Sequence, residues 1–179
     1  MRYLLIIFSV FLFSLTVISC AKKSGSSSST TNTTTSDNTT TTSSGLYIAV
    51  GASGTLLTSS DGTSWDNRTS GTTNNLYGVT YGNSTFVTVG DNGTILTSSD
   101  GTSWDNRTSG TTNNLYGVTY GNSTFVTVGD NGTILTSSDG TSWTERTSGT
   151  TTFLFGVTYG NNTFVTVGVS GTILTSSDG

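Results

Sequence analysis

Three arginines, Arg68, Arg107 and Arg146, are the residues best suited to bind an anionic ligand, because a guanidinium can hold a carboxylate through two parallel hydrogen bonds. They are spaced 39 residues apart, and the sequence around each is nearly the same. Residues related by a repeat occupy equivalent places in successive units. We therefore expect these arginines to radiate around the domain, each pairing with a nearby aspartate or lying in solvent, rather than to converge on one ligand.

Groups for acid–base or nucleophilic catalysis are scarce. The chain has no histidine, its one glutamate is Glu145, and its one cysteine is Cys20. Ser-His-Asp and Cys-His arrangements are therefore excluded, as is a histidine metal site. The turns at Asp91 and Asp130 offer one carboxylate each, whereas a calcium site needs about six oxygen ligands. We predict no catalytic residue, no metal site and no cofactor, and hence no enzyme.

Cys20 follows an apolar run, YLLIIFSVFLFSLTVI, that begins directly after Arg2. A positive residue followed by such a run is typical of a signal peptide, which we assign to residues 1–19. Residues 17–20, Val-Ile-Ser-Cys, resemble the bacterial lipobox. That resemblance implies cleavage before Cys20, lipidation of Cys20, and attachment to a membrane outside the cytoplasm, in the cell envelope at the outer membrane or cell surface. An uncleaved anchor is the alternative, although a membrane span needs roughly 20 apolar residues.

Residues 20–45 comprise this cysteine and a tether. From Ser24 to Ser44 the chain reads SGSSSSTTNTTTSDNTTTTSS, with no apolar residue and a single charge. Such a segment cannot bury enough surface to offset the entropy of ordering it, so we predict disorder. A flexible chain of this length reaches roughly 25 Å and would hold the following domain clear of the membrane.

Residues 46–179 contain about 3.5 copies of a 39-residue unit. Residues 74–112 and 113–151 are identical except that Asp105-Asn106 becomes Thr144-Glu145, and partial copies flank them at 46–73 and 152–179. A fixed period of this length predicts an array of one supersecondary unit.

Four short segments of each unit, such as 76–81, 85–89, 94–98 and 103–108, are bounded by turn residues, and none shows a helical period. Four antiparallel strands in about 40 residues are typical of a β-propeller blade, with a β-solenoid as the alternative. We predict an all-β fold, a β-propeller-like array of four-stranded antiparallel blades.

The four units supply 3, 4, 4 and 3 expected strands, a count that does not close a standard ring. The array is therefore expected to be incomplete or irregular. Three outcomes are open. The array closes as a small propeller, it stays open and self-associates through its unpaired blade edges, or it is a shortened product of a longer repeat array.

The segment Ser-Ser-Asp-Gly-Thr-Ser-Trp at 98–104 recurs at 59–65 and 137–143 and begins again at 176–179. It resembles the Asp-box, or BNR repeat, but is one residue shorter between Asp and Trp. The resemblance implies a turn between the third and fourth strands of a blade, in which the carboxylate accepts backbone N–H bonds. The residues to which it assigns this structural role are Asp61, Trp65, Asp100, Trp104, Asp139, Trp143 and Asp178.

Aromatic residues alternate along the expected strands. Tyr77, Tyr81 and Phe86 are expected in the core, although a carbohydrate-binding surface is an alternative for such rings. Phe153 and Phe155 stand where the preceding unit has Asn and Tyr, which makes the last unit more apolar and suits a contact surface or a closure seam.

The repeat region carries eight aspartates and one glutamate against three arginines, a net charge of −6. Since nucleic-acid affinity depends on basic residues, this excludes nucleic acid as a partner. We expect an exported, lipid-anchored, non-catalytic binding protein for a protein or glycan ligand.

Asp-boxes also occur in sialidases, other secreted glycosidases and a photosystem II assembly factor, which leaves two alternatives open. One is a sialidase-like or glycosidase-like enzyme, against which the lone glutamate and the repeat-related arginines weigh. The other is an assembly or stability factor for a membrane complex.

Overall fold

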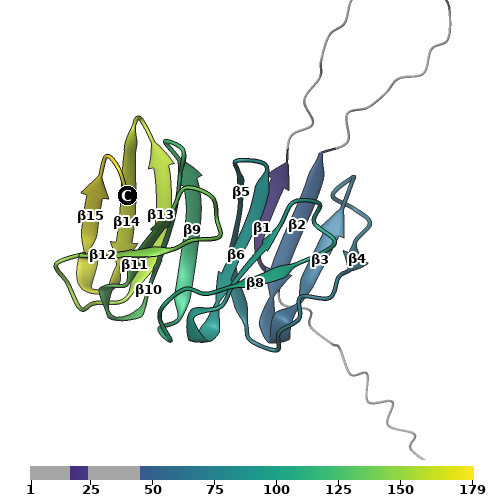
Figure 1. The fold of residues 1–179 in the computed structure, drawn as a ribbon, viewed down its shortest axis with the longest axis horizontal. Helices are drawn as coiled ribbons and strands as arrows, with labels where there is room; N and C mark the ends of the chain where they lie inside the picture. The colour runs from purple at the N-terminus through teal and green to yellow at the C-terminus, as the bar shows by residue number, and fades with distance from the viewer. Residues whose placement is uncertain (1–16, 24–44) are drawn as a thin grey trace, which may run out of the picture.

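The structure is a computed structural model that describes residues 17–23 and 45–179. In that part of the chain, fifteen strands form four antiparallel sheets, which stand side by side in a row (Figure 1). We number these sheets as blades 1 to 4 in chain order. The predicted all-β, propeller-like array of four-stranded blades is confirmed.

Within each blade the strands follow one another in space as they do in sequence. Blade 1 contains β1 (Val17–Lys23), β2 (Leu46–Gly51), β3 (Leu56–Ser59) and β4 (Asp66–Asn67). Blade 2 contains β5 (Leu76–Gly82), β6 (Thr85–Gly90), β7 (Ile95–Ser98) and β8 (Asp105–Arg107). Blade 3 contains β9 (Leu115–Gly121), β10 (Thr124–Gly129), β11 (Ile134–Ser137) and β12 (Thr144–Arg146). Blade 4 contains β13 (Leu154–Gly160), β14 (Thr163–Gly168) and β15 (Ile173–Ser176).

Two turns of each unit follow directly from its Asn, Ser and Gly residues. Asn83 and Ser84, with φ of 44° and 58°, form the two-residue turn between β5 and β6. A three-residue 3-10 turn joins the second and third strands, and its middle residue in blade 2, Asn92, has φ of 53°. Asparagine tolerates this left-handed backbone better than most residues, so the turn sequence sets where each hairpin reverses. The four 3-10 turns are η1 (Ala52–Gly54), η2 (Asp91–Gly93), η3 (Asp130–Gly132) and η4 (Val169–Gly171).

A bulge at the start of the first strand changes which residues are buried. Leu76 pairs with Gly90 and Gly78 pairs with Val89, so Tyr77 is left between two paired positions. Leu76 is consequently fully buried, whereas Tyr77 is only half-buried. The expectation that Tyr77 lies in the core was wrong, because a bulge shifts the alternation of the strand by one residue.

The core lies between blades rather than within them, because each sheet buries an apolar face against the next. Three hydrophobic clusters result, one at each junction. At the junction of blades 1 and 2 the buried residues are Ile48, Val50, Leu56, Leu76, Val79, Phe86 and Leu96.

Neighbouring first strands approach each other through a glycine and a tyrosine. A Cβ atom on Gly82 would lie 2.1 Å from Cγ of Tyr120 in the next blade, and Gly121 has the same relation to Tyr159. Any larger side chain at these glycines would force the blades apart. In β1 the equivalent position is Lys23, whose Nζ lies 5.5 Å from the centre of the Tyr81 ring, so a cation–π contact replaces the glycine–tyrosine contact.

β1 is the element that differs most from expectation. The opening strand of blade 1 was expected to be missing, and residues 20–23 were expected in the disordered tether. Instead Val17–Lys23 pairs with β2, and its register shift between Val17 and Ser19 matches the bulge at Tyr77. Its sequence, VISCAKK, shares no residue with the LYGVTYG of β5 at equivalent positions, so the repeat pattern gave no sign of it.

The remaining predictions for the N-terminal region concern residues outside the described part of the chain. These are the apolar run as far as residue 16 and the tether from residue 24 to residue 44. In the described part of the chain, no helix is long and apolar enough to cross a membrane.

Removing β1 is expected to destabilise blade 1. A fragment of residues 45–179 lacks the strand that pairs with β2 and packs against Val79, whereas a fragment of residues 17–179 retains it. We expect urea unfolding of the shorter fragment to show a loss on the order of 2–5 kcal/mol, since each lost backbone hydrogen bond contributes about 1 kcal/mol. Equal stability of the two fragments would show that β1 contributes nothing to the fold.

Candidate functional site

The turn at Asp100 is held by a compact set of hydrogen bonds. Asp100 Oδ1 accepts the backbone N–H groups of Thr102 at 2.7 Å and Ser103 at 2.9 Å, and it accepts the Ser98 hydroxyl at 3.0 Å. Gly101 has φ of 77° and donates its N–H to Ser98 Oγ at 2.7 Å. Because these bonds stabilise the carboxylate, with the Ser103 N–H contributing most, the pKa of Asp100 lies well below its usual range.

Blades 1 and 3 contain the same turn, and blade 4 contains its first residues. Asp61 and Asp139 accept equivalent backbone N–H bonds, which lower their pKa in the same way. Asp178 accepts the Ser176 hydroxyl at 2.8 Å. Each of these carboxylates is engaged with its own turn, so none is positioned as a catalytic acid or base.

The tryptophan that follows each turn differs between blades. Trp104 and Trp143 donate Nε1–H to the carbonyl oxygens of Gly101 and Gly140, and each ring packs near the phenylalanine of its own blade. Trp65 in blade 1 is 37% exposed. The seven residues to which the sequence resemblance assigned a structural role therefore all lie at the turn that follows the third strand of a blade.

These turns also join one blade to the preceding one. The turn glycines lie very close to the preceding blade. A Cβ atom added to Gly101 would be 2.5 Å from the Leu46 side chain, and one added to Gly140 would be 3.2 Å from the Val87 side chain. The Asn83 side-chain amide donates to the carbonyl of Ser138 across the junction of blades 2 and 3. The turn residues consequently belong to the scaffold that aligns the blades.

The three arginines lie at the outer strands of three different blades. Arg107 donates Nε–H to Thr97 Oγ1 at 2.8 Å and pairs with Asp105 at 2.9 Å. Arg68 makes the equivalent contacts with Thr58 and Asp66, and Arg146 donates to Thr136. They do not converge, so they form no common carboxylate-binding site.

A row of aromatic rings crosses three blades at the start of the first strands, and we call Tyr77, Tyr116, Phe155 and Phe153 the aromatic rim. The ring centres of Tyr77 and Tyr116 are 5.3 Å apart, and those of Tyr116 and Phe155 are 5.2 Å apart. Phe153 lies 6.4 Å from Phe155. The two phenylalanines are 44% and 49% exposed, so the rim ends in an open apolar surface on blade 4.

Carboxylates of the 3-10 turns stand beside the rim tyrosines. The Tyr77 hydroxyl donates to Asp91 Oδ1 at 2.7 Å, and this bond raises the pKa of Tyr77. Burial contributes most to raising the pKa of Tyr116, and the neighbouring Asp130 raises it further. Asp130 Oδ1 is buried and has no hydrogen-bond partner among the described residues, so we do not assign a bond from Tyr116.

The tyrosine and the aspartate change together along the repeat. In blade 4, Phe155 and Val169 take the places of Tyr116 and Asp130, so both the donor and the acceptor are absent. In blade 1 the acceptor position is Ala52, and Ile18 lies within the register shift that corresponds to the bulge. The polar pair is thus confined to blades 2 and 3, and the rim changes from polar to apolar toward blade 4.

Sequence reasoning identified Phe153 and Phe155 as a possible contact surface but did not recognise the rim. The paired loss of Tyr116 and Asp130 in the last unit was visible in the repeat and could have indicated that the two positions touch. Phe86 is fully buried and Tyr81 packs on it at 4.6 Å, as expected for core positions.

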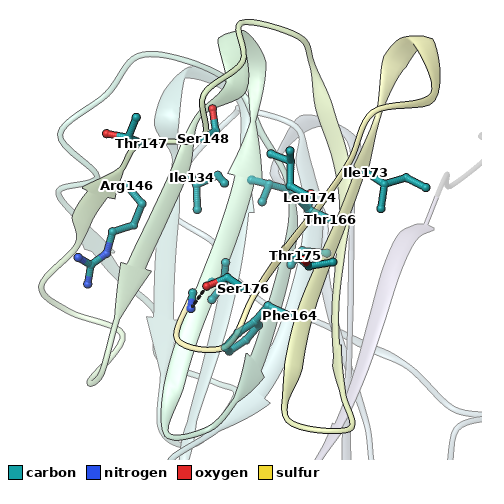
Figure 2. A pocket seen from close by; sticks show the side chains of 14 residues that line it. Ile134, Arg146, Thr147, Ser148, Phe164, Thr166, Ile173, Leu174, Thr175 and Ser176 are labelled. Carbon is teal, nitrogen blue, oxygen red and sulfur yellow. Dashed lines mark hydrogen bonds between the residues drawn. The ribbon is translucent and has the colours of Figure 1, made fainter.

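Several pockets lie along the described part of the row. Three are shallow and polar, with volumes of about 740, 730 and 620 Å³, and they are lined mainly by Thr, Ser, Asn and Gly of the segments that link one blade to the next. The fourth, of about 470 Å³, lies between blades 3 and 4 and is lined by Val126, Val128, Phe164 and Leu174 among others (Figure 2). No group of three or more metal-ligating side chains occurs within residues 17–23 and 45–179.

Comparison with solved structures supports the propeller fold. The chain is similar to the structure described as "YCF48 bound to D1 peptide", with a TM-score of 0.59 and 20% identity over 73% of this chain and 46% of that one. It is similar to "YCF48 from Cyanidioschyzon merolae", with a TM-score of 0.58 and 18% identity over 73% of this chain and 49% of that one. It thus spans about half the length of the YCF48 chains.

A third similar structure is that of "the computationally designed Ika4 protein", with a TM-score of 0.63, 13% identity and 92% of both chains covered. No protein-family model matches the chain, and no curated protein matches it.

The coupling of Tyr77 to Asp91 gives a double-mutant prediction. Tyr77→Phe removes the donor and leaves a carboxylate oxygen without its partner, which should destabilise the protein by about 1–2 kcal/mol. Tyr77→Phe combined with Asp91→Val recreates the pair found in blade 4 and should recover most of that loss. Urea unfolding of the single and double variants measures both effects. Strictly additive losses would show that the two side chains are not coupled.

Proposed function

We propose that this protein is an exported, lipid-anchored, non-catalytic binding protein whose aromatic rim contacts a protein or glycan partner. The observation that carries this proposal is the exposure of Phe153 and Phe155 at the end of a continuous row of rings. Large exposed aromatic side chains are uncommon on monomeric surfaces and are enriched at binding sites, since they bury much area at a small entropic cost.

The geometry of the rim favours a protein partner over a glycan. Neighbouring rings are tilted by 51° and 54° and stand about 5 Å apart, so they pack on one another and present no single flat face for a sugar. The presence of a bound peptide in one similar propeller structure also supports this choice.

The non-catalytic assignment is supported by the way the ionisable groups are used. The Asp61, Asp100 and Asp139 carboxylates bond their own turns, and we retain the interpretation of these turns as a shortened Asp-box. The arginines are divided among separate blades, and Glu145 is exposed on β12. The turn carboxylates thus serve the scaffold in this proposal.

The lipid anchor has a structural consequence in this proposal. The Cys20 side chain is exposed and lies within β1, which pairs with β2. Cleavage before Cys20 would remove Val17–Ser19 and leave Cys20–Lys23 of β1 to pair with β2, so a lipid on Cys20 would project from blade 1 itself. The domain would then lie at the membrane surface.

The anchor is tested by fatty-acid labelling in a bacterial host. The wild-type protein should incorporate an alkyne fatty acid and lose residues 1–19, so that intact mass spectrometry finds a chain beginning at a lipidated Cys20. Cys20→Ser should be unlabelled and uncleaved, because it has no thiol to modify. Ser24→Ala serves as the control and should be processed normally. Labelling of Cys20→Ser, or a different N-terminus, would contradict the lipoprotein assignment.

The rim is tested by selecting ligands from a displayed peptide library and from a glycan array. Phe153→Asn restores the residue of blades 2 and 3, and Phe155→Ala removes the other exposed ring. Ligands selected on the wild type should lose affinity for this double variant by at least about tenfold, as expected for buried aromatic anchors. Ile173→Thr, an exposed apolar residue of β15 outside the rim, should bind them unchanged. Ligands that bind the double variant equally well would exclude the rim as their site.

A further inference from the structure

The bond that the lipobox resemblance marks for cleavage lies within a paired strand. In β1, Ser19 stands opposite Val50 of β2, and Cys20 stands opposite Ala49. The pairing continues on both sides of this point, from Val17 to residue 23. The peptide bond between Ser19 and Cys20 is therefore part of the sheet of blade 1 rather than part of a free segment.

Side chains of β1 hold the strand from the other side, where it contacts β5 of blade 2 (Figure 1). Ser19 Oγ accepts the backbone N–H of Val79 at 3.4 Å. Ala21 packs against the hydrophobic cluster at the junction of blades 1 and 2. The Lys23 ammonium lies over the Tyr81 ring. The strand is thus held both by backbone pairing with β2 and by side-chain contacts with blade 2.

Hydrolysis of this bond requires the strand to leave the sheet. A peptidase binds the residues on both sides of the bond that it cuts, and a strand paired with its neighbour does not enter an enzyme cleft at the same time. Cleavage then occurs only in molecules whose strand has opened, so its rate falls with the fraction of open molecules. The reaction itself consumes one water molecule and leaves a carboxylate on Ser19 and an amino group on Cys20.

We propose, on the basis of the lipoprotein assignment, that pairing of β1 with β2 blocks hydrolysis of the Ser19–Cys20 bond, so that this reaction precedes the folding of blade 1. A chain whose first blade folds too early keeps residues 1–19. Exposure of the Cys20 side chain does not change this, because the strand is held through backbone groups.

The shortened strand keeps its inward contacts. Cleavage removes Val17–Ser19, whereas Ala21 and Lys23 stay, with their contacts to the blade junction and to the Tyr81 ring. Residues Cys20–Lys23 can therefore pair with β2 after the reaction. Only the order of the two events is constrained.

Lysine-specific proteolysis reports directly on β1, because Lys22 and Lys23 are the only lysines in the chain. The full chain in detergent micelles is compared with a peptide of residues 1–45, which contains the same segment and lacks β2. We expect cleavage of the folded chain to be at least about tenfold slower, and urea that unfolds the domain should remove the difference. Equal rates for the folded chain and the peptide would overturn the proposal.

Two neighbouring substitutions separate opening of the strand from a change in the protease site. Ala21→Asp places a charge against the apolar junction and should raise the cleavage rate of the folded chain toward that of its own peptide, since an unpaired charge in apolar surroundings favours the open strand. Cys20→Asp places the same charge on the exposed side of β1 and should leave the protection in place. Full protection of the Ala21→Asp chain would also overturn the proposal.

The order of events is tested with bacterial membranes that contain lipoprotein-processing enzymes. The folded full chain and the 1–45 peptide are incubated with these membranes, and intact mass spectrometry measures the loss of residues 1–19. Cleavage of the peptide should be at least about tenfold faster than cleavage of the folded chain. Equal cleavage of both would overturn the proposal and leave the lipoprotein assignment standing. Absence of cleavage from both would overturn the lipoprotein assignment and this proposal with it.

Discussion

Packing between neighbouring blades is the interaction on which the rest of this structure depends. A single sheet of four short strands has two faces and cannot bury either alone, so stability comes from apolar junctions such as that of Phe86 with Ile48 and Val50. Gly82 allows Tyr120 to lie against the first strand of its blade, and the turn at Gly101 rests on Leu46 and Ile48 of the preceding blade. The repeated glycines and aspartates are therefore explained by contacts between units.

The repeat made most of the fold predictable. Each strand and turn is encoded locally, by Asn83-Ser84, by Asn92-Gly93 and by the Ser98–Asp100 hydrogen bonds, and every copy reinforces the interpretation. The bulge at Tyr77 was not predictable, because simple alternation places that residue with Val79. Its register depends on the backbone of β6, which an alternation pattern does not contain.

β1 was missed for a different reason. The edge of β2 accepts any extended segment whose inward side chains are small or apolar, since the pairing uses backbone groups. Ala21 and Ser19 meet that requirement at the junction with blade 2, and Lys23 reaches the Tyr81 ring. Sequence similarity to the repeat was therefore unnecessary. The segment that resembles a lipidation signal thus also completes the sheet of blade 1.

Near-identity of the units determines where specific binding can arise. A residue present in every blade faces the same neighbours each time and serves the scaffold, as the turn aspartates do. Specificity requires positions at which one blade differs from the others, and blade 4 has such positions at Phe153, Phe155 and Val169. Chemistry specific to one blade therefore lies at these substituted positions rather than at residues shared by every unit.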